Sequence, residues 1–282
     1  MKDYNHTPIT LTIAGSDSGG GAGIQADIKA ISATGGYACS VITALTAQNT
    51  QGVSGIFPVP ADFVAAQLDA VFSDLDVVAV KIGMLNDSGI IRTIAAKLRE
   101  YRPEFVVLDP VMVATSGDRL LEPEAKQTLM DELVPLADIL TPNLPEAAEM
   151  FDYPVPQSDE EMLAMTGKIQ TFLHACSAQS QKQRLLLLKG GHLETSQQST
   201  DLLITPNSVS SMTASRIDTV NTHGTGCTLS AAIASYLAQG EGLNSACKLA
   251  KHYLTDALLH ANELFVGQGH GPVNHFYNLP RH

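Results

Sequence analysis

Several residue types are scarce in this sequence. Tryptophan is absent, aromatic residues make up 5% and charged residues 16% of the 282 positions. No apolar run approaches the ~18 residues that a membrane helix needs, and the apolar stretch after the polar N-terminus is too short for a secretory signal. The four cysteines, Cys39, Cys176, Cys227 and Cys247, form no C-x-x-C pair, which is typical of a reducing compartment. We therefore predict a cytoplasmic protein with no membrane partner.

Positive charge is also scarce. Lys and Arg number 17 against 29 Asp and Glu, so the formal net charge is -12. This balance repels nucleic acid, which we exclude as a partner. It does not exclude a phosphorylated ligand, because backbone amides and a bound cation can hold phosphate locally.

The residues that are abundant indicate the fold class. Hydrophobic residues make up 44% and glycine occurs 22 times. A core of small aliphatic residues with many glycines suits parallel strands that are covered closely by helices.

Strand and helix patterns alternate along the chain. Strands are predicted at 9–14, 39–45, 77–82, 105–109, 138–140 and 185–188, and helices at about 22–33, 60–72, 87–101, 122–133, 158–175, 225–238 and 244–264. The pattern predicts an α/β fold of three layers, with a central, mostly parallel sheet and helices on both faces. Residues 201–217 predict a small antiparallel hairpin at an edge. No linker divides residues 1–282, so we expect a single domain.

Ligands of such folds bind at the carboxyl ends of the strands, where two glycine-rich segments lie. Residues 15–23 (G-S-D-S-G-G-G-A-G) separate a strand from a helix and contain no dinucleotide, Walker or nucleophile-elbow motif. They predict a ligand loop, the alternative being a flexible turn. Residues 221–228 precede a helix, and the amides of Gly224, Thr225, Gly226 and Cys227 could stabilise a transferring phosphoryl group. That position would lower the pKa of Cys227. An ordinary capped helix with a small buried Cys is an equal alternative.

Polar residues at other strand ends could serve a nucleotide and its cation. Asn143 and Glu146 are three residues apart and could supply oxygens to magnesium, although a capping box explains the spacing better. Asp109 ends a buried strand and could position magnesium or phosphate, unless it only forms an Asp-Pro turn. Lys189 could reach a phosphate or be solvated.

Two residues near the first strands suit a heterocyclic ligand. The side-chain amide of Gln48 carries a donor and an acceptor, which match the edge of an aminopyrimidine. Asp27 in the first helix could contact an amino or hydroxyl group. A solvated glutamine is the alternative at position 48.

The ordered set of motifs is more specific than any one of them. It resembles the hydroxymethylpyrimidine/phosphomethylpyrimidine kinases of thiamine biosynthesis, in the ribokinase-like superfamily, over about residues 9–276. The matching segments are I-A-G-S-D-S-G-G-G-A-G-I-Q-A-D (13–27), V-I-T-A-L-T-A-Q-N-T (41–50), K-I-G-M-L (81–85), L-D-P-V-M (108–112), T-P-N-L-P-E-A (141–147), L-K-G-G-H (188–192) and N-T-H-G-T-G-C-T-L-S-A-A (221–232).

The resemblance implies a role for each of these segments. It implies transfer of phosphate from ATP, with Mg²⁺, to 4-amino-5-hydroxymethyl-2-methylpyrimidine and then to its monophosphate, commonly by a homodimer. Gln48 would bind the pyrimidine and residues 224–227 would form the anion hole. The other implied pocket residues are Gly15, Asp27, Thr46, Met84 and Val111, with Asn143 and Glu146 beside magnesium and Lys189 and Lys251 near the nucleotide.

Two features bear on the reaction and its rivals. Sugar kinases of this fold carry an Asp base where this chain has Cys227, so the proton acceptor is either a thiolate or no strong base at all. Some relatives that accept pyridoxal use a Cys shortly after D-P-V-M, whereas this chain has Val113-Ala114-Thr115. The alternatives to a pyrimidine kinase are therefore a pyridoxal or pyridoxine kinase and a non-catalytic pyrimidine sensor.

Overall fold

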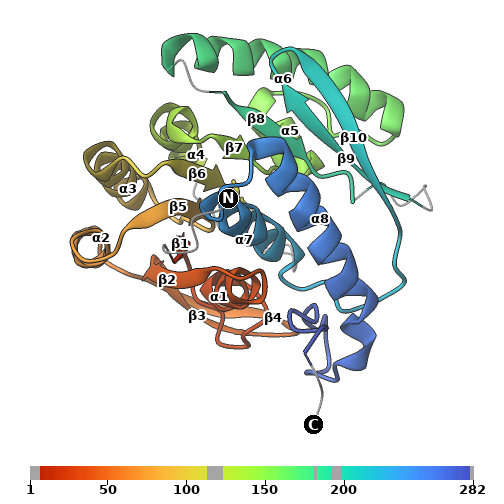
Figure 1. The fold of residues 1–282 in the computed structure, drawn as a ribbon, viewed down its shortest axis with the longest axis horizontal. Helices are drawn as coiled ribbons and strands as arrows, with labels where there is room; N and C mark the ends of the chain where they lie inside the picture. Colours follow the sequence, from red (N-terminus) through yellow and green to blue (C-terminus); the bar gives the residue numbers. More distant parts are fainter. Residues whose placement is uncertain (1–6, 113–122, 181–182, 192, 194–197, 280–282) are drawn as a thin grey trace.

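The central element is an eight-stranded sheet. The computed structural model describes residues 7–112, 123–180, 183–191, 193 and 198–279, and the strands of its main sheet follow the order β10-β9-β8-β7-β6-β5-β1-β2 (Figure 1). Six strands are parallel: β1 (Ile9–Ala14), β2 (Tyr37–Ile42), β5 (Val77–Ile82), β6 (Phe105–Leu108), β7 (Ile139–Leu140) and β8 (Leu185–Leu188). The predicted mostly parallel sheet is confirmed.

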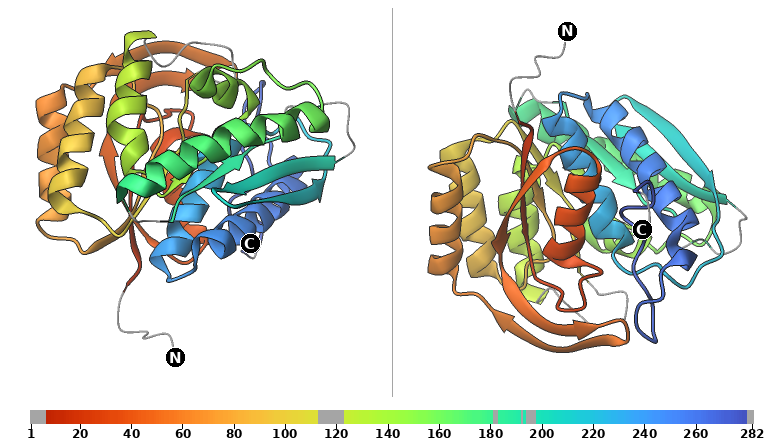
Figure 2. Two further views of the ribbon diagram at one scale, coloured as in Figure 1. Left: turned by 90° about the horizontal axis from the view of Figure 1, so that it is seen from above. Right: turned by 60° about the horizontal axis from the view of Figure 1, so that its bottom comes forward.

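Helices cover both faces of this sheet (Figures 1 and 2). One face carries α1 (Gly23–Ala33), α7 (Thr225–Ala238) and α8 (Leu243–Leu259). The other carries α2 (Ala61–Phe72), α3 (Ser88–Tyr101), α4 (Pro123–Thr128), α5 (Leu144–Phe151) and α6 (Asp159–Ser180). The three-layer ribokinase-like arrangement predicted from the sequence is therefore present.

The apolar strands explain why both faces are covered. In β8, Leu186 and Leu188 enter the core beneath α5 and α6, whereas Leu185 and Leu187 enter the core beneath α7 and α8. Successive side chains of a strand point to opposite faces, so four consecutive leucines require cover on both sides. Each buried leucine contributes about 1.5–3 kcal/mol relative to exposure.

Helix boundaries follow capping residues. The carboxylate of Asp87 accepts from Ile90 N at 2.9 Å at the start of α3. The hydroxyl of Ser158 accepts from Glu161 N at 3.2 Å, so α6 also begins at a side-chain cap. None of the helices in the described part of the chain combines the length and apolar character that spanning a bilayer requires.

The edge hairpin forms where it was predicted. Strands β9 (Gln198–Thr205) and β10 (Ser208–Ser215) are antiparallel, and Thr205 pairs with Ser208 across the two-residue turn. The Thr205 hydroxyl accepts from Ser208 N at 3.0 Å, which fixes the turn. Since β9 is also antiparallel to β8, this hairpin closes one end of the parallel sheet.

A second hairpin corrects the prediction for residues 39–58. The expected strand 39–45 is broken at Thr43, whose N–H donates to Ala14 O and whose hydroxyl donates to Met84 O. The chain then leaves the main sheet as β3 (Ala44–Asn49), which pairs with β4 (Gly52–Pro58) beside that sheet (Figure 2). Gln48 therefore lies in a strand and not in the loop that was expected.

Other boundaries also differ from the predictions. The helix expected at 122–133 is α4, a π-helical turn (Leu129–Leu133) and a 3₁₀ turn (Val134–Leu136). Helix α6 runs to Ser180, and α8 ends at Leu259, before a 3₁₀ turn (Ala261–Glu263). The C-terminal segment is irregular as expected, yet its Val273, Asn274 and His275 are buried. Positions 113–115 and 192, which the sequence analysis also considered, lie outside the described residues.

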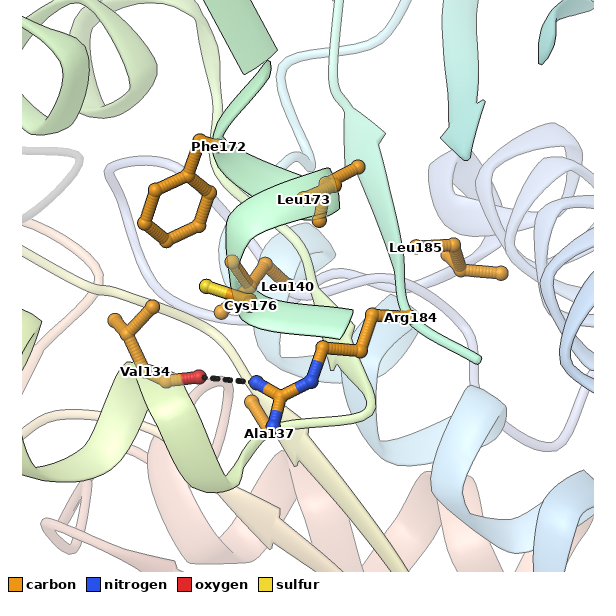
Figure 3. A pocket seen from close by; sticks show the side chains of 8 residues that line it. All are labelled: Val134, Ala137, Leu140, Phe172, Leu173, Cys176, Arg184 and Leu185. Carbon is orange, nitrogen blue, oxygen red and sulfur yellow. Dashed lines mark hydrogen bonds between the residues drawn. The ribbon is translucent and has the colours of Figure 1, made fainter. Parts of the chain in front are cut away.

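The amino end of β8 is packed. Figure 3 shows a gap between α6 and strands β7 and β8, into which the guanidinium of Arg184 extends. Arg184 donates to the carbonyl oxygens of Val134, at 3.3 Å, and Pro135. The gap is too narrow to admit a water molecule. The polar residues that the sequence analysis proposed for ligand binding lie at the opposite, carboxyl ends of the strands.

Candidate active site at the carboxyl ends of the strands

The first turn of α7 faces two charged residues at strand ends. Asp109 follows β6 and Lys189 follows β8. A Cβ atom placed on Gly226 would lie 3.4 Å from Lys189 Nζ and 3.6 Å from Asp109 Oδ2. The first amides of a helix have no carbonyl partner within it, so α7 directs free N–H groups at this point. The structure thus places predicted anion-hole residues beside Asp109 and Lys189.

Asp109 is held by several hydrogen bonds. Its Oδ1 accepts from Lys189 Nζ at 3.0 Å and from Thr141 Oγ1 at 2.9 Å, and Ser230 Oγ lies 3.4 Å from Oδ2. Burial opposes the charge on Asp109, but Lys189 and Lys81 outweigh it and keep the pKa of this carboxyl below its ordinary value. Asp109 is therefore an ionised group with a fixed orientation.

Glu146 and Asn143 form the capping box that the spacing favoured. Asn143 Oδ1 accepts from Glu146 N, and Glu146 Oε2 accepts from Asn143 N, both at 2.8 Å. Burial raises the pKa of Glu146 to about 7, with Lys189, 4.0 Å from Oε2, acting against the shift. This capping geometry starts α5, a helix that the sequence analysis did not predict as a separate element.

The oxygens at this end suit a hard cation such as magnesium. No group of three or more His, Cys, Asp or Glu side chains that could cage a metal occurs in the described ranges. Glu146 and Asp109 nonetheless lie around the same lysine, Lys189. Magnesium keeps several waters and needs only one or two protein carboxylates beside substrate phosphates. The residues present therefore fit that ion.

Two glycines allow the loop after β1 to pack against α7. Gly224 has φ +77°, and a Cβ there would collide with Gly21 O. Gly23 has φ +55°, and a Cβ there would collide with Gly15 O. Both residues combine a positive φ with a close backbone approach, which only glycine tolerates without strain. The loop and the first turn of α7 therefore form one unit.

Asp17 organises this loop. Its carboxylate accepts from the amides of Gly19, Gly21 and Ala22 at 2.8–2.9 Å and contacts His223 Nε2 at 2.9 Å. Burial opposes ionisation, but His223 and the amides lower the pKa of Asp17 to about 2. Asp17 is therefore a carboxylate that links the loop to the residue before Gly224.

The predicted pyrimidine-binding residues lie near one another. A Cβ on Gly15 would collide with the end of the Met84 side chain, so these two residues touch. Thr46 Oγ1 donates to Ser16 O at 2.8 Å and lies 3.1 Å from Gln48 Oε1. The structure thus groups Gly15, Met84, Thr46 and Gln48 along β3 and the ends of β1 and β5.

Val111 is placed at the neighbouring strand end. Its N–H donates to Asp109 O at 2.8 Å, and its side chain is partly exposed. Among the described residues no hydrogen bond joins Val111 to Thr46 or Gln48, so the assignment of Val111 to the pyrimidine pocket stays a prediction.

Asp27 lies in a buried ion pair. Thr12 and Lys81 are neighbours on β1 and β5, and both side chains reach Asp27 Oδ2, at 2.6 and 2.7 Å. Lys81 and Asp27 are both 0% exposed. Burial opposes the charge on Lys81, but Asp27 and other acidic neighbours raise its pKa. Asp27 Oδ1 has no hydrogen-bond partner among the residues that the structure describes. Because this atom is also shielded from solvent, direct contact between Asp27 and a ligand stays a prediction.

The prediction that helix α7 lowers the pKa of Cys227 is wrong. Burial, together with Asp27 and Asp109, raises the pKa of this thiol to about 11, although Lys81 and a hydrogen bond from the Gly23 amide act against the shift. The cost of removing a thiolate from water exceeds the stabilisation that the helix end offers. Cys227 is therefore a neutral thiol.

The ammonium group of Lys251 is paired with Asp201. It extends from α8, and its Nζ lies 2.7 Å from Asp201 Oδ2. The other oxygen of Asp201 accepts from Gly190 N at 2.9 Å. Lys251 therefore supports the turn after Lys189 through Asp201, and direct contact with a nucleotide stays a prediction that this geometry does not favour.

Sequence reasoning gave no role to three residues of the site: Asp17, Lys81 and His223. All three lay inside quoted motifs, and a lone acid among glycines, such as Asp17, is a signal for a loop-organising carboxylate. Lys81 interrupts the otherwise apolar strand Val77–Ile82. A lysine within a buried strand requires a paired acid, and this signal could have indicated the pair with Asp27.

The fold and the site define the class of protein. A mostly parallel sheet with helices on both faces, and a glycine-rich helix start facing an Asp–Lys pair, are features of a ribokinase-like phosphotransferase. The sequence profile of the family "Phosphomethylpyrimidine kinase" matches residues 17–274. The chain belongs to this family.

Similar proteins agree with the family. The hydroxymethylpyrimidine/phosphomethylpyrimidine kinases of Rhizobium meliloti and Escherichia coli are 53% and 49% identical, over 96% and 98% of this chain and 98% and 99% of theirs. Among solved structures, a Bacillus subtilis pyridoxal kinase in complex with ADP has a TM-score of 0.84 at 34% identity, covering 96% of this chain and 98% of that one. A Clostridium difficile phosphomethylpyrimidine kinase has a TM-score of 0.74 at 42% identity, covering 88% and 98%. The predicted family and fold are confirmed.

Proposed function

We propose that this protein transfers the γ-phosphoryl group of ATP to 4-amino-5-hydroxymethyl-2-methylpyrimidine, and a second phosphoryl group to the resulting monophosphate, in thiamine biosynthesis. The main observation in support is that the first turn of α7 faces Lys189 and Asp109. His223, which precedes this turn, lies 3.4 Å from the side-chain amide of Gln48 and so connects the turn to strand β3. Relatives with 49–53% identity over nearly the full length bear the name of this activity.

The chemistry rests on positioning and charge stabilisation. In the proposed step the hydroxymethyl oxygen attacks the γ-phosphorus, the bond from this phosphorus to the bridging oxygen breaks, and ADP leaves. The amides of Gly226 and Cys227 hold the charge that develops on the phosphoryl oxygens. Lys189 supplies a positive charge beside them. Phosphoryl transfer requires little covalent assistance from a protein, so such fixed donors provide most of the effect.

The Cys227 thiol does not act as a preformed base in this proposal. It is neutral near pH 7, so the alcohol proton leaves without a thiolate acceptor at the start of the reaction. A strong base is unnecessary where the transition state is loose and the nucleophile is already positioned.

Magnesium and ATP fit the other side of the site. Glu146, with Asp109 and Asn143 nearby, would hold the ion, and Lys189 would contact the phosphates. When bound, the cation neutralises charge on the phosphate chain. The carboxylates are fixed beforehand by the capping box of α5 and by Thr141, so they keep their orientation in its absence.

The pyrimidine would lie against Gln48, Thr46, Gly15 and Met84. Asp27 is buried with Lys81, so contact between its unpartnered Oδ1 and the amino or hydroxyl group of the substrate would require the site to rearrange. Burying a carboxylate oxygen without a partner is costly, so a ligand donor at this point would be strongly favoured.

A pyridoxal kinase is the second candidate. The structure is similar to that of a pyridoxal kinase at a TM-score of 0.84. The sequence identity to it, 34%, is lower than the 49–53% to curated pyrimidine kinases. The pyrimidine is therefore the better-supported substrate.

The assembly and location are also proposals. We propose that residues 1–282 act as one domain in the cytoplasm, as expected for a chain whose scattered cysteines form no C-x-x-C pair. We further propose a homodimer through the outer face of the β3–β4 hairpin, where the cross-strand neighbours Leu45 and Phe57 are exposed. Light scattering of the wild type and of Phe57→Ser would test the dimer, and an unchanged mass in the variant would argue against this face.

One assay tests the activity. The protein is incubated with ATP, magnesium and either the hydroxymethylpyrimidine or pyridoxal, and the products are identified by mass spectrometry. We expect addition of one and then two phosphoryl groups to the pyrimidine. Faster turnover of pyridoxal would favour the second candidate, and no magnesium-dependent product from either would refute kinase activity.

A further inference from the structure

The side chain of Gln48 is contacted from two sides. Its amide nitrogen lies 3.4 Å from His223 Nε2, and its amide oxygen lies 3.1 Å from Thr46 Oγ1. The oxygen and nitrogen of an amide have nearly the same size, so their partners decide which orientation is stable. The protons on His223 and Thr46 therefore determine what Gln48 presents to a ligand.

His223 must carry a proton on Nε2. This atom lies 2.9 Å from Asp17 Oδ2, which also accepts from the amides of Gly21 and Ala22. A carboxylate surrounded by donors can only accept, so His223 donates to it. The Gln48 amide nitrogen would then face another N–H group, which is repulsive, whereas the amide oxygen would accept from the same proton.

Thr46 has one hydroxyl proton, and that proton is already used. Thr46 Oγ1 lies 2.8 Å from Ser16 O, a carbonyl oxygen that can only accept. The hydroxyl therefore cannot also donate to Gln48. Its lone pairs can accept from the Gln48 amide nitrogen.

We propose that His223 and Thr46 fix the Gln48 amide with its oxygen toward His223 and its nitrogen toward Thr46. His223 and Thr46 are positioning residues in this arrangement. They use one lone pair of the oxygen and one N–H of the nitrogen. The remaining lone pair and the remaining N–H point along the same edge of the amide and stay available. The backbone of Gln48 is held as well, because Gln48 N donates to Ser18 Oγ at 2.9 Å and Ser18 Oγ donates to Gln48 O at 2.8 Å.

This orientation determines the order of donor and acceptor that the substrate must show. The inference rests on the proposed function, in which Gln48 binds the pyrimidine. A 4-aminopyrimidine offers a ring-nitrogen acceptor beside an amino donor, and the free edge of the amide can pair with both. A 4-oxo analogue offers a ring N–H beside a carbonyl oxygen, the reverse order. The ring cannot turn over to compensate, because its hydroxymethyl group must face α7.

The test compares kcat/KM for the 4-amino substrate and its 4-oxo analogue. Thr46→Val and His223→Leu each remove one partner and allow the amide to rotate, whereas Thr46→Ser and His223→Gln keep a hydroxyl or an N–H donor. We expect the preference for the amino substrate to fall by roughly threefold to tenfold in Thr46→Val and His223→Leu, the range for one lost hydrogen bond. It should be retained in Thr46→Ser and His223→Gln, and KM for ATP should change little.

Each outcome bears on the proposal separately from the activity. A wild type that phosphorylates neither pyrimidine would refute the proposed function. An active wild type whose preference is unchanged in both Thr46→Val and His223→Leu would overturn the inference alone. Thermal melting identifies a variant that fails to fold. Thr46→Val preserves side-chain shape, so it decides the matter if His223→Leu is unstable.

Discussion

Replacement of Lys81 by Met breaks the buried ion pair beneath α7. Lys81 and Asp27 are 0% exposed and 2.7 Å apart, so the variant leaves a carboxylate in the core with only the Thr12 hydroxyl as a donor. Removing one partner of a buried pair costs about 3–5 kcal/mol of unfolding free energy. For a chain of this size, that corresponds to a decrease in melting temperature of roughly 6–20 °C.

Lys97→Met is the matched control. Lys97 makes contacts of similar length, 2.6 Å to Asp69 and 3.0 Å to Glu100, but these acids lie on the surface. Exposed pairs contribute little, so we expect Lys97→Met to melt close to the wild type. Urea unfolding of both variants measures the difference. Equal stability of Lys81→Met and Lys97→Met would refute the argument that burial makes the Asp27 pair important.

The pH dependence of Lys81→Met has a definite sign. Without Lys81, burial of Asp27 keeps its folded-state pKa above the unfolded value, so the folded variant binds a proton more tightly than the unfolded chain. Stability of the variant relative to the wild type should then increase as the pH falls through the raised folded-state pKa of Asp27 toward the ordinary carboxyl range. The double variant Lys81→Met/Asp27→Asn should recover part of the loss at pH 7. A double variant that loses the sum of the two single losses would show that the residues are not coupled.

Three further predictions concern the site. Gly224→Ala should lose about 1–3 kcal/mol in urea unfolding and most of kcat, because φ is +77° and the new Cβ meets Gly21 O. Gly242→Ala, with open space around its Cα, should behave like the wild type. Equal behaviour of the two variants would contradict the packing argument. Glu146 becomes a carboxylate as pH rises through about 7, so kcat/KM at limiting magnesium should rise over this range, and a similar rise in Glu146→Gln would exclude Glu146 as the titrating group. Iodoacetamide should alkylate Cys227 near pH 7 roughly two orders of magnitude more slowly than a free cysteine, measured by peptide mass spectrometry, and rapid alkylation would indicate a thiolate.

The sequence predicted most of the main sheet because its strands are apolar on both faces. Runs such as Leu185–Leu188 are bounded by polar residues and can only be buried strands. The β3–β4 hairpin gave no such signal. Most residues of β4 are exposed, and Leu45 and Phe57 face outward, so neither burial nor alternation marks these strands. The break at Thr43 depends on contacts with Ala14 and Met84, which are distant in the sequence.

Site residues were predictable where one motif carries its own geometry. The Asn143–Glu146 spacing predicts a capping box from local chemistry alone, and the structure contains it. The pKa of Cys227 could not be predicted in this way. The helix end is a local feature that favours a thiolate, but the burial that raises the pKa results from packing between the loop after β1 and the first turn of α7.

The first turn of α7 helps to explain how a chain with a net charge of -12 could hold a polyphosphate. Because successive side chains of a strand point to opposite faces, Thr12 and Lys81 both lie on the sheet face beneath α1 and α7. There Lys81 is close enough to interact electrostatically with Cys227. Asp27 pairs with the Lys81 ammonium group at 2.7 Å, so the positive potential at the first turn of α7 arises mainly from backbone amides and from Lys189 beside Gly226. These groups are held in place by the core and need no rearrangement when charge develops on a phosphoryl group. Acidic residues on the distant surface are screened by salt and act on this point only weakly.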